Sequence, residues 1–141
     1  MVMLSRVADQ LYWMSKYLER ADYTARVVDL TLNLTLDQPP TLASRSWQRI
    51  LLCLRVLPVT VARNAAIYAD TQLFNDHNVT QMLTFDASNN DSVVACIASA
   101  RNNARQVREQ ISSDMWQQLN QLYLTMRQTQ MDQILDRPAP R

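Results

Sequence analysis

The residues best equipped for chemistry in this sequence are carboxylates and guanidinium groups at helical spacings. Glu19 and Arg20 stand side by side, and a second group follows steps of four and three far along the chain: Arg101, Arg105 and Arg108, with Glu109 adjacent. A glutamate can transfer a proton or bind a metal, and guanidinium groups on one helical face can hold carboxylates or phosphates. One hypothesis is therefore a ligand-binding or catalytic site for an anionic or peptide substrate.

The same charges also have a structural interpretation. An arginine or glutamate that is enclosed by a helical bundle must be paired, so the arginine row could neutralise acidic residues of another helix. Antiparallel helices would form two such pairs in a single register, Asp22 with Arg108 and Asp29 with Arg101. Exposed pairs contribute only about 0.2–1 kcal/mol, so they would select the helix orientation more than stabilise the fold.

Three aromatic residues, Tyr12, Trp13 and Tyr23, share a helical face with Glu19 and Arg20, away from the main apolar stripe. The outer face of a helix that packs on one side only should be polar. The pattern therefore predicts a central helix with protein or a ligand on both sides. Three interpretations of this face stay open: packing on other helices around buried ion pairs, a functional pocket, and a surface for a partner protein.

Composition argues against several other kinds of site. Among the 141 residues there is no glycine, which phosphate-binding loops and tight hairpins require. Cys53, Cys96 and the single histidine, His77, are too few and too scattered for a zinc site of about four ligands. We expect no metal and no cofactor, and both thiols buried and free in a reducing cytoplasm.

The charge balance and the hydropathy of the chain argue against nucleic acid and membranes as partners. The net charge of +1, from 14 basic and 13 acidic side chains, gives no electrostatic case for nucleic acid. No apolar run reaches the roughly 18 residues that a transmembrane helix needs. These features predict a cytoplasmic protein that binds neither nucleic acid nor a membrane.

The missing glycine and the apolar spacing together predict an all-α helical bundle of about four to six helices. A long helix is expected over residues 6–36, with Ser5 as its N-cap, because one apolar row follows steps of four and three: Val7, Leu11, Met14, Leu18, Ala21, Ala25, Val28 and Leu32. A late helix from about Ser92 repeats these steps around Ala100 and Ala104. We predict that the two helices pair antiparallel where their alanines meet.

The remaining segments predict shorter elements. Helices are expected over residues 44–57 and 79–85, with less regular helical pieces at 61–67 and 71–74. The late helix changes register after Ile111, and the Ser112-Ser113-Asp114 run offers N-cap chemistry, so a break is predicted there. Residues 1–135 are expected to form one domain, followed by a disordered tail at 136–141.

Two blocks of the sequence resemble one protein family. The first comprises Met3-Leu4-Ser5-Arg6-Val7-Ala8-Asp9, Leu11-Tyr12-Trp13-Met14, Tyr17-Leu18-Glu19-Arg20-Ala21 and Thr24-Ala25-Arg26. The second comprises Ala100-Arg101-Asn102-Asn103-Ala104-Arg105, Val107-Arg108-Glu109, Ile111-Ser112-Ser113, Met115-Trp116, Leu119-Asn120 and Leu122-Tyr123-Leu124. In order and spacing they resemble the bacterial alpha-E domain family, which is named for its helices and its Glu-Arg motif.

The resemblance implies that Glu19 and Arg20 are the motif of that family, with no catalytic role established for them. Alpha-E proteins tend to be encoded beside circularly permuted ATP-grasp proteins, transglutaminase-like proteins and proteasome-related peptidases. This neighbourhood implies a role in the amide-bond chemistry of peptides. The chain departs from the family at Ser15-Lys16, where a glycine and an arginine are common, and at Asp22, where glutamate is frequent.

Members of the family are typically longer, so the resemblance covers their N-terminal half only. It implies self-association, or a partner protein that covers the missing half. We therefore expect a helical interaction or accessory module of an ATP-grasp or transglutaminase-type peptide-modifying system, rather than an enzyme. The alternative is the ligand-binding or catalytic site described first. Burial of Glu19 and Arg20 should discriminate, because enclosed and paired side chains would argue against a site.

Overall fold

The computed structural model describes residues 2–54 and 74–129. These residues form helices and connecting turns, which confirms the all-α prediction. Five α-helices and one 3₁₀ turn follow in order: α1 (Val2–Thr35), α2 (Pro40–Cys53), α5 (Asp76–Thr84), α6 (Val93–Gln106), the 3₁₀ turn Arg108–Gln110, and α7 (Ser113–Gln128). The predicted helical piece at 61–67, all but the last residue of the one at 71–74, and the tail at 136–141 lie outside the described residues.

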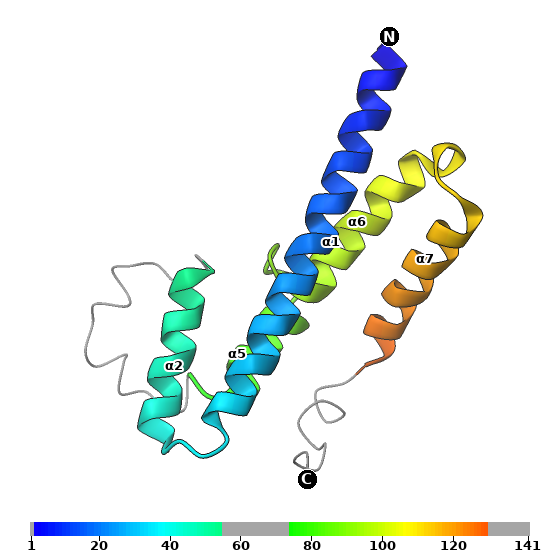
Figure 1. Ribbon diagram of the computed structural model, residues 1–141. Coiled ribbons are helices and arrows are strands. Elements are labelled where there is room, and N and C mark those ends of the chain that lie inside the picture. The colour runs from blue at the N-terminus through cyan, green and yellow to red at the C-terminus, as the bar shows by residue number, and fades with distance from the viewer. Residues whose placement is uncertain (1, 55–73, 130–141) are drawn as a thin grey trace.

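The long first helix is the spine of the fold. α1 spans 34 residues, or roughly 50 Å at 1.5 Å per residue, and α6 and α7 lie on one side of it and α2 on the other (Figure 1). It begins at Val2, so Ser5 lies inside the helix and the predicted N-cap is wrong. Its end at Thr35 agrees with the predicted end at residue 36. Pro39 follows as the N-cap residue of α2, and Pro40 is the first residue of that helix.

α1 and α6 pack antiparallel, as predicted. Met14 clusters with Ala100 and Ala104, which are fully buried, whereas Ala21, two turns further along α1, clusters with Val93 and its neighbours near the start of α6. Residue numbers thus rise along α1 as they fall along α6. The small alanine side chains of α6 let the two helix axes approach closely.

The predicted meeting of alanine pairs is wrong in detail. Ala25 is exposed, and Thr24 is buried in its place with 2% of its surface accessible. A straight helix has 3.6 residues per turn, so a seam with a period of 3.5 drifts around its surface over several turns. In the second half of α1 the buried stripe therefore includes Thr24, Thr31 and Thr35 as well as Val28 of the predicted row.

The two predicted interhelical ion pairs do not form. Asp22 accepts a hydrogen bond from Arg26 of its own helix, at 3.1 Å, and Arg101 donates one to Asn120 of α7, at 2.9 Å. The helices pair in another register, because Ala21 lies against the first two turns of α6 rather than against its middle. The charge spacing was compatible with several registers, and the packing of large and small side chains selected this one.

The second half of α1 is held by α2 and α5. Val28 lies in a cluster of buried residues: Trp47, Leu51, Phe74, Val79 and Leu83. Asp76, the first residue of α5, accepts hydrogen bonds from Trp47 Nε1 at 2.6 Å and from Thr35 Oγ1 at 3.1 Å. One carboxylate therefore joins three helices at this end of the molecule.

The predicted break after α6 is confirmed. α6 ends at Gln106, and α7 starts after Ser112, whose hydroxyl accepts a hydrogen bond from the backbone N–H of Met115. Ser92 caps α6 in the same way. The helices predicted at 44–57 and 79–85 are present as α2 and α5, with each starting a few residues earlier than expected.

Candidate functional site

The face of α1 that carries Glu19 and Arg20 is open to solvent. Tyr12, Trp13 and Tyr23 expose 55%, 48% and 58% of their surfaces, and Glu19 and Arg20 are exposed as well. Of the three interpretations left open, packing on other helices is wrong for the described part of the chain. The buried residues of α1 lie on its other faces, where Met14 and Ala21 pack against α6 and α7 and Val28 packs against α2 and α5.

Glu19 and Arg20 have different partners. Glu19 accepts a contact from Lys16 Nζ at 3.4 Å, and Arg20 Nη1 lies 3.0 Å from Asp91 Oδ1. The guanidinium of Arg20 also lies 5.9 Å from the ring centre of Tyr17. The interpretation of Glu19 and Arg20 as buried, paired side chains is therefore wrong, because both are exposed and each has a partner at the surface. Burial thus gives no argument against a site at these residues.

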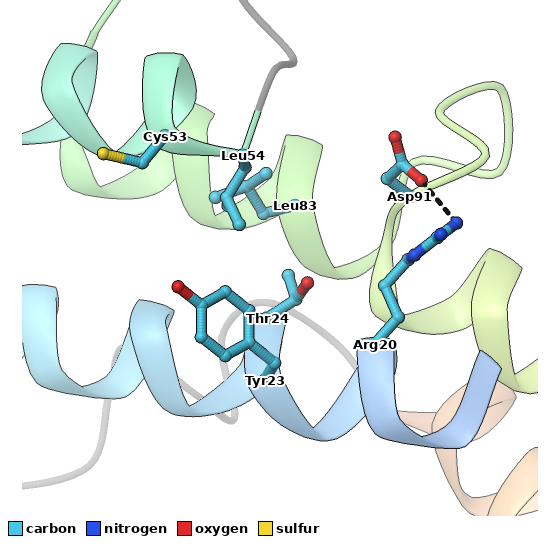
Figure 2. Close-up of a pocket in the computed structure, with 7 residues that line it drawn as sticks. All are labelled: Arg20, Tyr23, Thr24, Cys53, Leu54, Leu83 and Asp91. Atoms are coloured by element: carbon cyan, nitrogen blue, oxygen red, sulfur yellow. Dashed lines mark hydrogen bonds and ion pairs between the residues drawn. The ribbon is translucent and has the colours of Figure 1, made fainter. Parts of the chain in front are cut away.

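Arg20 and Asp91 form one wall of a pocket of about 320 Å³. The described residues that line it come from α1, the end of α2, α5 and the turn before α6: Arg20, Tyr23, Thr24, Cys53, Leu54, Leu83 and Asp91. Figure 2 shows the ion pair on one side and Cys53 on the opposite side, with the apolar side chains between them. The pocket thus combines an apolar floor with one charged wall.

The charged wall can bind a polar ligand. The side chains of Arg20 and Asp91 keep 48% and 45% of their surfaces accessible. A guanidinium has five N–H donors, so contact with one carboxylate oxygen leaves donors for a second acceptor. A small molecule with a carboxylate or amide beside an apolar group would match this arrangement.

A buried thiol lies near the same ion pair. Burial raises the pKa of Cys96, the positive charge of Arg20 lowers it in part, and the negative charge of Asp91 raises it. The Cys96 S–H donates to the backbone carbonyl of Asn90, at 3.7 Å. This raised pKa keeps the Cys96 thiol in its neutral form. Cys53 is exposed, so the expectation that both cysteines are buried holds for Cys96 alone.

The arginine row lies apart from Arg20 in its contacts. Arg101 donates to Asn120 and stacks on Tyr123, with 4.6 Å between the guanidinium carbon and the ring centre. Arg108 stacks on Trp116 at 5.1 Å. Arg101 thus joins α6 to α7 and Arg108 joins the 3₁₀ turn to α7, while Arg105 and Glu109 are exposed. The structure therefore separates Glu19 and Arg20 on α1 from the arginine row, in which Arg101 and Arg108 pack on α7.

The pocket also contains residues that the sequence did not single out. Asp91 follows a run of turn-forming residues, and nothing in its spacing from Arg20 predicts their contact. Leu54 and Leu83 belong to helical ends that α1 brings together. Among the described residues, no three histidine, cysteine or carboxylate side chains gather as metal ligands would, and His77 is exposed. No helix of the described ranges is long and apolar enough to cross a membrane.

The model of the Alpha-E family, a predicted alpha-helical domain with a conserved ER motif, matches residues 3–139. The chain belongs to the Alpha-E family. A glutamate followed by an arginine occurs once in the sequence, at Glu19 and Arg20, so this Alpha-E chain carries the motif on the exposed face of α1. No curated protein and no solved structure matches the chain.

Proposed function

We propose that this Alpha-E chain is a helical interaction module that serves an ATP-grasp or transglutaminase-type peptide-modifying system. The observation that carries the proposal is the position of the Glu-Arg motif, on a solvent-facing helix surface between exposed aromatic side chains. Aromatic residues and arginine are enriched where proteins bind one another. The family resemblance supports the choice of system.

The aromatic side chains are held in place before any partner binds. Tyr12 and Trp13 pack edge to face with ring centres 5.5 Å apart, and Trp13 lies 6.0 Å from Tyr17. Lys16 lies 5.5 Å from the ring centre of Tyr12. Because these contacts already restrict the side chains, a partner that binds here loses less conformational entropy on association.

A reconstituted reaction tests the proposal. The purified chain would be added to an ATP-grasp peptide ligase from the same organism, and ATP-dependent amide formation would be followed. We expect the chain to change the rate, and the Trp13→Ala variant to need at least about tenfold more protein for the same effect. Leu124→Ala, on the exposed side of α7, should behave as the unmodified chain does. A ligase rate that is independent of the chain would contradict the proposal.

The pocket beside Arg20 supports a second candidate, the binding of a small carboxylate-bearing or peptide ligand. Its support is the half-exposed guanidinium at the wall of a 320 Å³ space. Calorimetry with short peptides and amino acids would test it. Binding should weaken at least about tenfold in Arg20→Ala, because a charged hydrogen bond is lost. Equal binding by both proteins would contradict this candidate.

A further inference from the structure

The outer face of α1 has the pattern of a helix-pairing seam. On the side of α1 away from α6 and α7, seven exposed residues follow one another at steps of three and four: Tyr12, Lys16, Glu19, Tyr23, Arg26, Leu30 and Leu34. The central one, Tyr23, also borders the pocket beside the end of α2. Leu30 and Leu34 expose 62% and 68% of their surfaces, values that are high for leucine. Steps of this kind give the stripe along which two helices pack side by side.

Side chains at matching distances from Tyr23 along this outer seam are compatible with one another in a helix pair. Tyr12 and Leu34 lie equally far from Tyr23 along the helix, and both are apolar or aromatic. Glu19 and Arg26 lie about one turn from Tyr23 on its two sides and carry opposite charges. Turning the helix end for end about Tyr23 therefore places Tyr12 on Leu34 and an acid on a base. It also places Lys16 opposite Leu30, where the hydrocarbon stem of the lysine can pack on the leucine.

We propose that two copies of this chain pair antiparallel through the outer seam of α1, with Tyr23 at the two-fold axis. Tyr12 then packs on Leu34 of the partner subunit, and Glu19 pairs with Arg26 of the partner subunit. A two-fold axis repeats each contact, so both pairs occur twice. The inference rests on the proposed interaction role and names the chain that binds this face.

Charge selects the antiparallel orientation. In a parallel pair of the same helices, each residue would lie opposite its own copy, so Glu19 would meet a glutamate and Arg26 an arginine. Like charges at that distance destabilise a helix pair. The present partners of both side chains are one turn away on α1, at Lys16 and Asp22, and are exposed to solvent. Such contacts are weak and are readily exchanged for contacts across an interface.

The apolar area also favours a stable partner. The exposed parts of Tyr12, Tyr23, Leu30 and Leu34 together amount to roughly several hundred Å², in the range that marks an interaction site on a soluble protein. The seam extends along most of α1, so a second α1 of equal length would cover it from end to end. A shorter partner segment would leave part of the stripe exposed.

The oligomeric state and a charge exchange test the proposal. Analytical ultracentrifugation of the full chain should show a dimer that dissociates on dilution. Glu19→Arg should place arginines opposite each other and raise the dissociation constant at least about tenfold, as should Arg26→Glu. The double variant Glu19→Arg/Arg26→Glu restores opposite charges across the axis and should restore the dimer. Circular dichroism confirms that each variant remains helical.

A matched control and a crosslink define the geometry. Leu124→Asp introduces a charge on the exposed side of α7 and should leave the dimer intact, whereas Tyr23→Asp should abolish it. In a Cys53→Ser background, a mixture of Tyr12→Cys and Leu34→Cys chains should form a disulfide between the two kinds of chain. Predominant crosslinks between identical chains would overturn the antiparallel arrangement.

Failure of this inference differs from failure of the proposed function. A chain that stays monomeric up to millimolar concentration overturns the dimer. If Trp13→Ala still weakens the effect on the ligase in that case, the interaction role stands with another partner on the seam. If the dimer forms and the ligase does not respond, self-association stands and the proposed role in peptide modification fails.

Discussion

Arg20 Nη1 lies 3.0 Å from Asp91 Oδ1, and this ion pair joins the middle of α1 to the turn that leads into α6. It is the long-range contact of the Glu-Arg motif, since Glu19 pairs with Lys16 on its own helix. Both side chains of the pair are about half exposed. The motif therefore contributes one tether at the surface of the bundle rather than a buried element of its core.

Removal of this tether should affect stability only slightly. In Arg20→Ala the free energy of unfolding should fall by less than about 1 kcal/mol, because solvent screens a half-exposed ion pair. Asp91→Ala should have a similar effect, and the double variant should differ little from either single one. Urea denaturation followed by circular dichroism measures all three. A loss above about 3 kcal/mol would show that the motif stabilises the core.

The two alanine positions should respond differently to enlargement. Ala104 is fully buried against α1, so Ala104→Leu should destabilise the fold by about 1–3 kcal/mol or more through overpacking. Ala25 is exposed, and Ala25→Leu should stay within about 0.5 kcal/mol of the unmodified chain. Thermal unfolding of the two variants side by side checks this. Equal destabilisation would favour the alanine-to-alanine seam expected from the sequence.

The hydrogen bond between Trp47 Nε1 and Asp76 Oδ1 should be important for stability. Trp47 is fully buried, so Trp47→Phe leaves a cavity and removes a donor to a carboxylate, at a cost of about 2–4 kcal/mol. Asp76→Asn keeps an acceptor oxygen and should cost less. Denaturant unfolding followed by tryptophan fluorescence compares the two variants. A smaller effect for Trp47→Phe than for Asp76→Asn would contradict the assignment.

The two cysteines should differ in their reaction with a thiol reagent. Cys53 is exposed and should react at once, whereas Cys96 is buried and its pKa is raised, so its thiolate forms only at a pH above the ordinary range for cysteine. Cys53→Ser should therefore leave only the slow phase, which should quicken as the pH rises. Asp91→Asn removes a charge that raises the pKa of Cys96 and should shift this phase to lower pH. Two equally fast phases in the unmodified chain would contradict the burial of Cys96.

Local features of the sequence were sufficient to predict the elements. The missing glycine, the apolar steps of α1 and the serines at positions 92 and 112 predicted an all-α chain, its long first helix and the break before α7. These features act through backbone conformation and nearest turns, so they hold wherever the helix lies. The family could be identified in the same way, because its motif is a short stretch of sequence.

The environment of the candidate residues was decided by tertiary structure alone. Whether Glu19 and Arg20 are buried depends on which side of α1 the other helices cover. Because both sides of α1 carry large side chains, helical spacing does not determine which side that is. The partner of Arg20 is likewise set by the register between α1 and α6, which follows from side-chain packing rather than from matching charges. The sequence by itself determined the helices and the motif, and the packing of α6 in one register placed that motif on the surface beside Asp91.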